Sequence, residues 1–141
     1  MALVQNKKIG LEYSIESKKV FGIELVGSEV KSLKGNLGNL DGARIAVVGG
    51  QLKLLNAYIP IYQEKNNLGV DPYRTRTLLA KKGEILELKN LQHGQNLHIF
   101  PISIFTKGRI IKIECGVGKR LKKQDKREVI RKKDSKRVDL E

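Results

Sequence analysis

The stretch GSEVKSLKGNLGNLD, residues 27–41, lies between two segments whose apolar residues alternate as they do in strands. It predicts one short helix, with Ser28 as the N-cap and Glu29 near the positive end of the helix dipole. Gly35 is expected to adopt the left-handed conformation that ends the helix. The apolar face that we expect to point into a core is formed by Val30, Leu33 and Leu37.

Lys31 and Lys34 are three residues apart and share a second face of this helix. A helix of about two turns is not stable alone in water, so packing must hold it in place. That packing would keep the two ammonium groups at a fixed separation, which suits a polyanionic partner. A capped and solvated connector helix is the alternative interpretation of the same residues.

The chain has 141 residues and a formal net charge of +13, from 28 Lys and Arg against 15 Asp and Glu. This surplus attracts polyanions, and nucleic acid is the expected partner because neutralised phosphates release condensed counterions. An anionic membrane is the competing interpretation. The chain has no apolar run of the roughly 20 residues that a spanning helix needs, and its N-terminus lacks the apolar region of a signal peptide. We therefore expect no membrane insertion and a cytoplasmic location.

Period-2 alternation and turn residues predict three β-hairpins. In the second hairpin, Gly49-Gly50 supplies the positive φ angles that a tight turn requires. Pro101 in the third cannot donate to a ladder and is expected at an edge or a bulge. The predicted strand pairs are 10–16 with 19–26 around Ser17-Lys18, 44–48 with 51–57 around Gly49-Gly50, and 96–106 with 109–117 around Lys107-Gly108.

A second helix is predicted at residues 81–91, where Ile85, Leu88 and Leu91 form an apolar stripe. Six strands with turn signals at this spacing favour a small barrel. We therefore predict a mainly β (α+β) fold, a six-stranded OB-like barrel with two or three flanking helices. OB-folds bind oligonucleotides with one face and its loops, which agrees with the positive charge.

The segment 60–76 is expected to be an irregular loop that ends in Tyr73-Arg74-Thr75-Arg76. Two arginines beside a tyrosine suit phosphate clamping and base stacking. A structural loop whose tyrosine packs on the core is the alternative. Asn6-Lys7-Lys8 is a second candidate for phosphate contact, and a solvated chain end is its alternative interpretation.

The sequence becomes strongly basic from Gly118 onward, and residues 118–141 carry +6 of the net charge. With almost no apolar residues, this segment cannot offset the entropy cost of folding alone. We predict two parts: an OB-like RNA-binding barrel at residues 1–118, and a basic tail at residues 119–141 that is disordered until a polyanion binds it.

The sequence offers no pattern of catalytic or metal-binding residues. His93 and His98 lack the spacing of metal ligands, and the single cysteine, Cys115, is expected to be an inert core thiol in an apolar strand. Glu29 has no partner for acid–base catalysis, so it is expected to accept hydrogen bonds from Arg, Lys or a ribose. We predict no enzyme activity, no metal and no cofactor, and keep a barrel-fold nuclease as the enzymatic alternative.

Four separated motifs resemble the SsrA-binding protein family, also named small protein B. They are Asn6-Lys7-Lys8, the helix Glu29–Lys34 with the GNLDGA turn that follows it, Asp71–Leu79, and Asp125–Glu128. The resemblance implies an OB-type barrel with flanking helices that binds the tRNA-like part of transfer-messenger RNA and delivers it to stalled ribosomes. It also implies a role without catalysis and a monomer in the RNA complex. The alternative function is that of a general OB-type RNA-binding or ribosome-assembly protein.

Residue pattern and resemblance together give the expected contacts. The residues expected to bind RNA are Asn6, Lys7, Lys8, Glu29, Lys31, Ser32, Lys34, Asn39, Tyr73, Arg74 and Arg76. The resemblance implies that the tail enters the vacant message channel near the decoding centre and becomes helical there. The tail residues expected to contact the ribosome are Lys119, Arg120, Asp125, Lys126 and Arg127.

The tail departs from the family pattern at several positions. Lys122-Lys123 correspond to about two additional residues, Gln124 stands where many members have His or Tyr, and only 14 residues follow Arg127. These differences bear on the helix of the tail more than on RNA binding. Leu11 also replaces a His that is common in the family.

Overall fold

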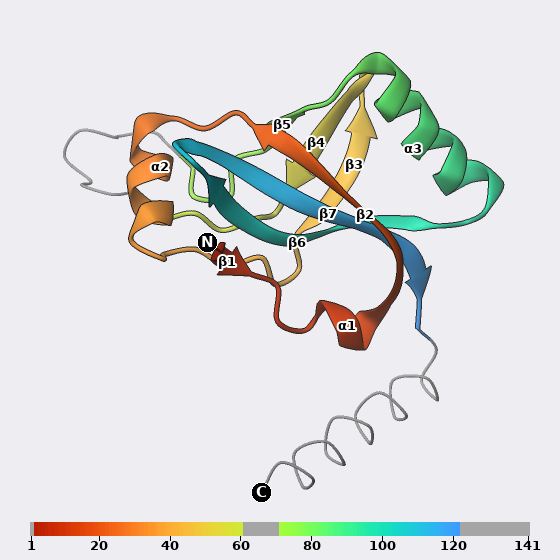
Figure 1. Cartoon of the computed structure of the whole chain (residues 1–141), viewed down its shortest axis with the longest axis horizontal. Coiled ribbons are helices and arrows are strands. Elements are labelled where there is room, and N and C mark those ends of the chain that lie inside the picture. The colour runs from red at the N-terminus through yellow and green to blue at the C-terminus, as the bar shows by residue number, and fades with distance from the viewer. Residues whose placement is uncertain (1, 61–70, 122–141) are drawn as a thin grey trace, which may run out of the picture.

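The computed structural model describes residues 2–60 and 71–121, in which antiparallel strands are the most abundant regular structure (Figure 1). They form one seven-stranded sheet in the order β1-β6-β7-β2-β5-β4-β3. The strands are β1 (Ala2–Gln5), β2 (Tyr13–Ile23), β3 (Arg44–Val48), β4 (Gln51–Leu55), β5 (Arg76–Leu79), β6 (His98–Lys107) and β7 (Ile110–Arg120). The helices are α1 (Ile9–Glu12), α2 (Gly27–Lys34) and α3 (Lys82–Gly94).

The prediction of a mainly β, OB-like fold with flanking helices is confirmed, and two of its details are wrong. The sheet has seven strands rather than six, and it is not closed into a barrel. It coils far enough that Cα atoms of β3, at one edge, come within 8 Å of β6, beside the other edge. Within residues 2–60 and 71–121, no hydrogen-bonded ladder joins these two strands. Figure 1 shows α2 and α3 at opposite ends of the coiled sheet.

The first predicted hairpin is wrong, because residues 13–23 form the single strand β2. This strand pairs with β7 along most of its length, and the register shifts between Ile15 and Ser17, which marks a β-bulge. Ser17-Lys18 contains neither Gly nor Asn, the residues that favour the positive φ of a two-residue turn. The bulge interrupts the alternation, so one long strand resembles two short ones in sequence.

The other two predicted hairpins are confirmed as β3–β4 and β6–β7. Gly49 and Gly50 have φ angles of 58° and 76°, as the tight turn requires. Pro101 lies at a register shift of β6, where the ladder is interrupted and the missing N–H is tolerated. Gly116 of β7 lies opposite Phe100, and a Cβ atom there would come within 2.3 Å of the phenyl ring. Only glycine therefore leaves room for this ring.

The core lies inside the coiled sheet and is completed by one residue from each long helix. Leu33 of α2, Leu88 of α3 and Ile113 of β7 are all fully buried. The predicted apolar stripe of the second helix is confirmed in this way, and the helix extends to Gly94. Leu37 is 46% exposed, so its predicted place in the core is wrong.

The helix α2 begins differently from the prediction. Val26 is the N-cap residue, and its backbone N–H donates to Glu29 Oε1 at 3.0 Å. The Ser28 side chain is buried, and its Oγ has no hydrogen-bond partner within the described part of the chain. The carboxylate three residues into the helix therefore satisfies the open backbone donor at this end.

The helix α2 also ends one residue later than the prediction placed its left-handed stop. Gly35 has a φ of −85°, and Asn36 has the left-handed value of 59°. The N–H of Asn36 donates to Leu33 O, and the N–H of Leu37 donates to Ser32 O. These two bonds form a Schellman motif, in which asparagine tolerates the left-handed position.

Candidate nucleic-acid interface

The centre of the site is Glu29 of α2, which is 1% exposed and lies between Arg74, in the loop that leads into β5, and Arg76, the first residue of β5. Arg74 Nη2 donates to Glu29 Oε1 at 2.6 Å. Arg76 Nε donates to Glu29 Oε2 at 2.7 Å, and Arg76 Nη2 lies 2.5 Å from the same oxygen. Residues 47 positions apart are thereby held together through one carboxylate.

Arg76 has no exposed surface and uses its guanidinium group to connect three segments. Besides Glu29, Nη1 donates to Ala57 O at 2.6 Å and Nη2 donates to Pro72 O at 3.0 Å. Burial lowers the pKa of Arg76, and the hydrogen bond and charge of Glu29 counteract this effect. A guanidinium group stays protonated in proteins, so this residue is a buried cation that requires its carboxylate partner.

Burial also acts on Glu29, where by itself it raises the pKa of the carboxyl group. The hydrogen bonds from Arg74, from the Val26 N–H and from Arg76, together with the charge of Arg76, outweigh burial. The pKa of Glu29 therefore lies below its ordinary value of 4.5, and the carboxylate is ionised at neutral pH. Two arginines and one carboxylate leave the cluster with one surplus positive charge.

Three of the expected RNA-binding residues are buried: Glu29, Ser32 and Arg76. The Ser32 hydroxyl donates to Pro60 O at 2.6 Å, so it also ties α2 to the neighbouring loop. Buried side chains offer no surface to a ligand, and these three instead join α2 to the segments packed beside it. The expectation that Glu29 accepts hydrogen bonds from arginine is confirmed.

The exposed part of the cluster faces solvent beside two tyrosines. The Arg74 side chain is 35% exposed and Tyr73 is 55% exposed. The Tyr73 ring lies 5.1 Å from the ring of Tyr58, measured between centroids. Sequence reasoning missed Tyr58, because no local pattern indicates that residue 58 meets residue 73. Lys31 and Lys34 lie exposed on α2.

The segment between α2 and β3 connects this cluster to the N-terminal motif. Asn39 and Tyr58 exchange two backbone hydrogen bonds, at 2.8 and 2.9 Å. Asn6 Nδ2 donates to Pro101 O at 3.2 Å and to Leu40 O at 3.5 Å. The polar groups of Asn6 and Asn39 are thus used within the protein, where they connect the N-terminal motif to the cluster around Glu29. We call the surface residues Lys31 and Lys34, Tyr73 and Arg74, and Lys7 and Lys8 the strip.

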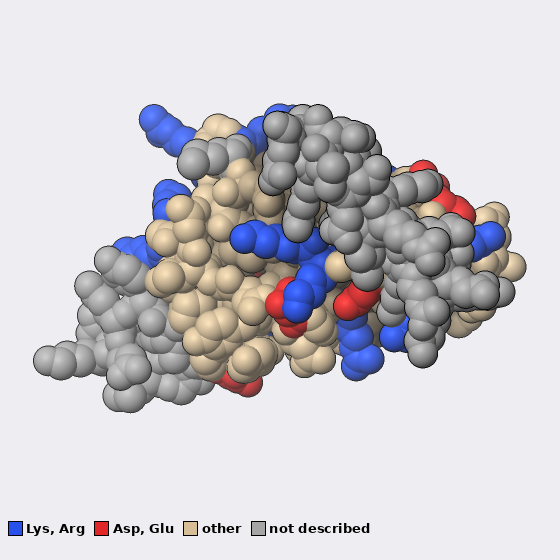
Figure 2. All heavy atoms as spheres, turned by 90° about the horizontal axis from the view of Figure 1, so that it is seen from below, with Lys and Arg blue, Asp and Glu red and all other residues tan. Residues whose placement is uncertain are grey.

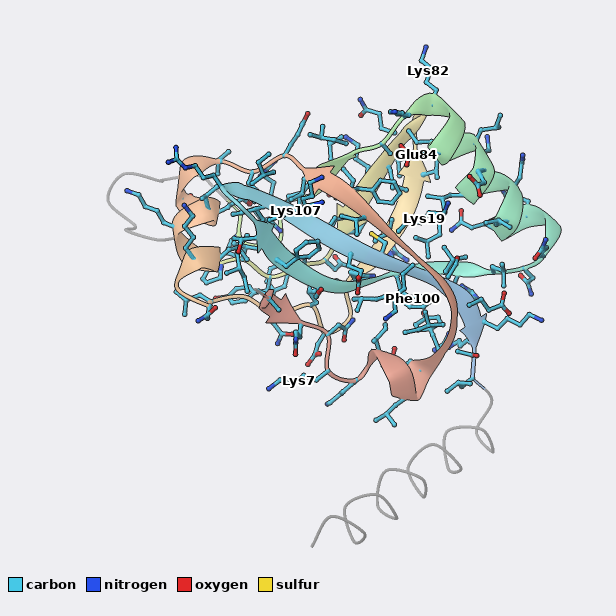
Figure 3. All side chains as sticks on the ribbon, viewed as in Figure 1. Lys7, Lys19, Lys82, Glu84, Phe100 and Lys107 are labelled. Carbon is cyan, nitrogen blue, oxygen red and sulfur yellow. The ribbon has the colours of Figure 1, made fainter. Side chains whose placement is uncertain are left out.

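Charges of both signs occur near the N-terminal motif. Figure 2 views the molecule from the side of β1 and α1, and Lys and Arg side chains lie there beside Asp and Glu side chains. Lys7 and Lys8 are exposed, and Figure 3 shows Lys7 pointing away from the body of the molecule. These two lysines are therefore accessible to a polyanion.

Two of the five expected tail residues belong to the sheet. Lys119 and Arg120 lie at the end of β7, where they pair with Ser14 and Tyr13 of β2. The strand therefore continues two residues past the predicted boundary at 118. The other expected contacts, Asp125, Lys126 and Arg127, lie outside the described residues.

Cys115 is buried in the core, as predicted, and burial raises its pKa. Among residues 2–60 and 71–121, no three His, Cys, Asp or Glu side chains come together in a way that could hold a metal ion. No helix in the same ranges is long and apolar enough to cross a membrane.

Residues 3–140 match the family described as SmpB protein. The chain is 36% identical over 135 residues to the SsrA-binding protein of Lactobacillus gasseri, which covers 96% of this chain and 89% of that protein. It is 38% identical over 133 residues to the SsrA-binding protein of Bacillus licheniformis, which covers 94% and 85%. The fold is also similar to that of a chain in the solved structure described as "tmRNA-SmpB: a journey to the center of the bacterial ribosome". The two chains superpose with a TM-score of 0.69 and are 29% identical, and the match covers 90% of this chain and 93% of that one. The chain is therefore a member of the SmpB protein family.

Proposed function

We propose that this chain binds transfer-messenger RNA and delivers it to stalled ribosomes in trans-translation. The observation that carries this proposal is the family match over residues 3–140, with relatives named SsrA-binding proteins and a structural neighbour described in complex with that RNA on the ribosome. In this role the protein is a binding partner without a catalytic step of its own, and it works in the cytoplasm.

The strip between α2 and the N-terminal motif is the proposed contact for the tRNA-like part of the RNA. Lys31, Lys34 and Arg74 supply positive charge to phosphates, and Tyr73 supplies an aromatic face to an unstacked base. Glu29 and Arg76 act indirectly, because their buried ion pair fixes Arg74 relative to α2. Lys7 and Lys8 extend the cationic surface along the strip.

The basic tail is proposed to contact the ribosome in the empty message channel. Its cationic composition suits a channel lined with ribosomal RNA, and folding on binding would let it report a vacant channel at modest affinity. Since Lys119 and Arg120 pair with β2, the tail that can be removed without cutting the sheet begins after Leu121.

Capture from a bacterial lysate tests the RNA partner. The full chain is immobilised, and the RNA that co-purifies with it is sequenced. Strong enrichment of transfer-messenger RNA over bulk tRNA is the expected result. A random mixture of RNAs would instead support a general OB-type RNA-binding protein.

Removal of residues 122–141 tests the division of labour. We expect this truncation to keep affinity for transfer-messenger RNA within about threefold, because the sheet and the strip remain intact. The loss of positive charge accounts for the small decrease. Tagging of incomplete proteins in a reconstituted translation assay should be lost. Normal tagging by the truncated chain would contradict the proposed role of the tail.

A further inference from the structure

A pocket of about 350 Å³ lies between the N-terminal segment around α1 and the turn that precedes β3. Its polar walls include Asn6, Lys8 and Glu12 on one side and Asp41 and Arg44 on the other. The volume is at the lower end of the range for small-molecule sites, which is roughly 300–1,000 Å³. The RNA-binding residues expected from sequence include Asn6 and Lys8, but not the remaining members of this pocket.

The walls of the pocket are ordered by hydrogen bonds. Asn6 Nδ2 bonds to Leu40 O, which fixes the N-terminal wall against the turn. The Asp41 N–H donates to Asn39 Oδ1 at 2.7 Å, and the Ala43 N–H donates to Leu40 O at 3.0 Å. The turn is therefore preformed by its backbone and by the Asn39 side chain, which leaves the side chains of Asp41 and Arg44 at the pocket.

One wall is aromatic and equally fixed. Tyr13 stacks on Phe100 with ring centroids 4.4 Å apart and an angle of 18° between the rings, and it also contacts the His98 ring at 5.8 Å. These neighbours limit the motion of the Tyr13 ring, which lines the pocket. A planar ligand would thus meet an aromatic group that is already in position.

Four charged side chains of the pocket have no partner in the part of the chain that the structure describes. Lys8, Glu12, Asp41 and Arg44 form neither an ion pair nor a side-chain hydrogen bond within residues 2–60 and 71–121. Two carboxylates and two cations cancel, so a phosphate or a metal ion would meet repulsion as well as attraction. A neutral ligand with adjacent donors and acceptors can pair with a carboxylate and a cation of this pocket at the same time.

We propose that this pocket binds an unstacked guanine base of the RNA. The N1–H and the 2-amino group of guanine are neighbouring donors, and they match the two acceptor oxygens of one carboxylate, Asp41. Guanine O6 and N7 are acceptors, and they match the ammonium or guanidinium groups of Lys8 and Arg44. Adenine presents an acceptor at N1, which faces the carboxylate unfavourably. RNA-binding proteins commonly read splayed loop bases through these edges.

This proposal rests on the proposed RNA-binding function and adds a base preference to it. The test is titration of the ¹⁵N-labelled full chain with GMP, AMP and ribose 5-phosphate, followed by NMR at the backbone amides of Gly42 and Ala43. We expect GMP to shift these signals with an affinity about tenfold higher than that of AMP, the discrimination typical of one bidentate base contact. Ribose 5-phosphate should shift them least.

Asp41→Asn is the decisive variant, since asparagine suits the same turn and the Asp41 carboxylate has no partner to lose among the described residues. It should reduce the preference for GMP over AMP to about onefold, with a spectrum as dispersed as that of the parent. Glu24→Gln, an exposed carboxylate on the other side of α2 in the sequence, is the matched control and should keep the preference.

Equal responses to all three compounds would overturn the proposal, because they would indicate phosphate binding alone. No shift at Gly42 and Ala43, or an unchanged preference in Asp41→Asn, would overturn it as well. Lysate capture separates this failure from failure of the proposed function: enriched transfer-messenger RNA without a guanine preference would refute only the pocket assignment.

Discussion

Replacement of Glu29 by glutamine removes one buried negative charge and hardly changes the shape of the side chain. The buried guanidinium of Arg76 would keep its bonds to Ala57 O and Pro72 O but would lose its ion-pair partner. Removal of one partner from a buried ion pair costs about 3–5 kcal/mol. We expect about 3 kcal/mol for Glu29→Gln, at the lower end, because the amide oxygen still accepts a hydrogen bond.

A loss of this size is a large part of the stability of a single domain, which is about 5–15 kcal/mol. The assay is urea unfolding of the full chain followed by far-UV circular dichroism, with the free energy of unfolding extrapolated to water. Glu24→Gln removes an exposed carboxylate and serves as the control, with an expected change within about 0.5 kcal/mol. If both variants unfold with equal free energies, the buried ion pair is not what stabilises α2 against the loop.

The same variant has a signature in its pH dependence. Because the pKa of Glu29 in the folded chain lies below 4.5, its contribution to stability is complete above that pH and is lost as the pH falls through the folded-state pKa. The parent should therefore lose stability on acidification below about pH 4.5. In Glu29→Gln this part of the acid dependence should be absent, and urea midpoints measured between pH 3 and 6 would show whether it is.

Three further predictions concern the lysines of α2, Tyr73 and the single cysteine. The double substitution Lys31→Ala and Lys34→Ala should change the free energy of unfolding by no more than about 0.5 kcal/mol. It should reduce the slope of log affinity against log salt by about 1.4–1.8, as measured by filter binding to transfer-messenger RNA. An unchanged slope would show that neither lysine contacts phosphate. Tyr73→Ala should weaken RNA binding by about 1–3 kcal/mol while Tyr73→Phe retains it, and equal losses in both would argue against stacking. Cys115 should react with a thiol reagent only after urea unfolding, because burial raises its pKa; rapid reaction of the folded chain would contradict its place in the core.

Local sequence was sufficient wherever one short-range rule acted alone. The Gly49-Gly50 turn requires positive φ, and no other residue pair in the segment supplies it as well. The existence of the short helix and its last residue, Lys34, were predicted from its apolar spacing and from Gly35, whereas the helix begins at Gly27 and not after a cap at Ser28. The hairpin predicted at residues 10–26 is wrong, because alternation alone does not distinguish a β-bulge within one strand from a turn between two strands.

Some features of the candidate site could be predicted from local sequence, and others could not. The identities of Lys31, Lys34, Tyr73 and Arg74 as exposed, charged or aromatic surface residues followed from pattern and resemblance. The sequence did not reveal that Arg76, two residues further, is buried, because alternation along β5 gives no sign of which face closes over a carboxylate. The meeting of Tyr58 with Tyr73, and of Asp41 with Lys8 around one pocket, depends on contacts between distant segments.

The sequence by itself determined the mainly β architecture, the basic charge and the motifs of the family, since composition, periodicity and spacing are carried by neighbouring residues. Only the tertiary structure decided which members of those motifs face solvent and which hold the interface from within. The physical reason is burial: an ionised side chain can lie inside the protein only where its counter-charge and hydrogen-bond partners are supplied, and for Glu29 and Arg76 those partners come from segments that are distant in the sequence.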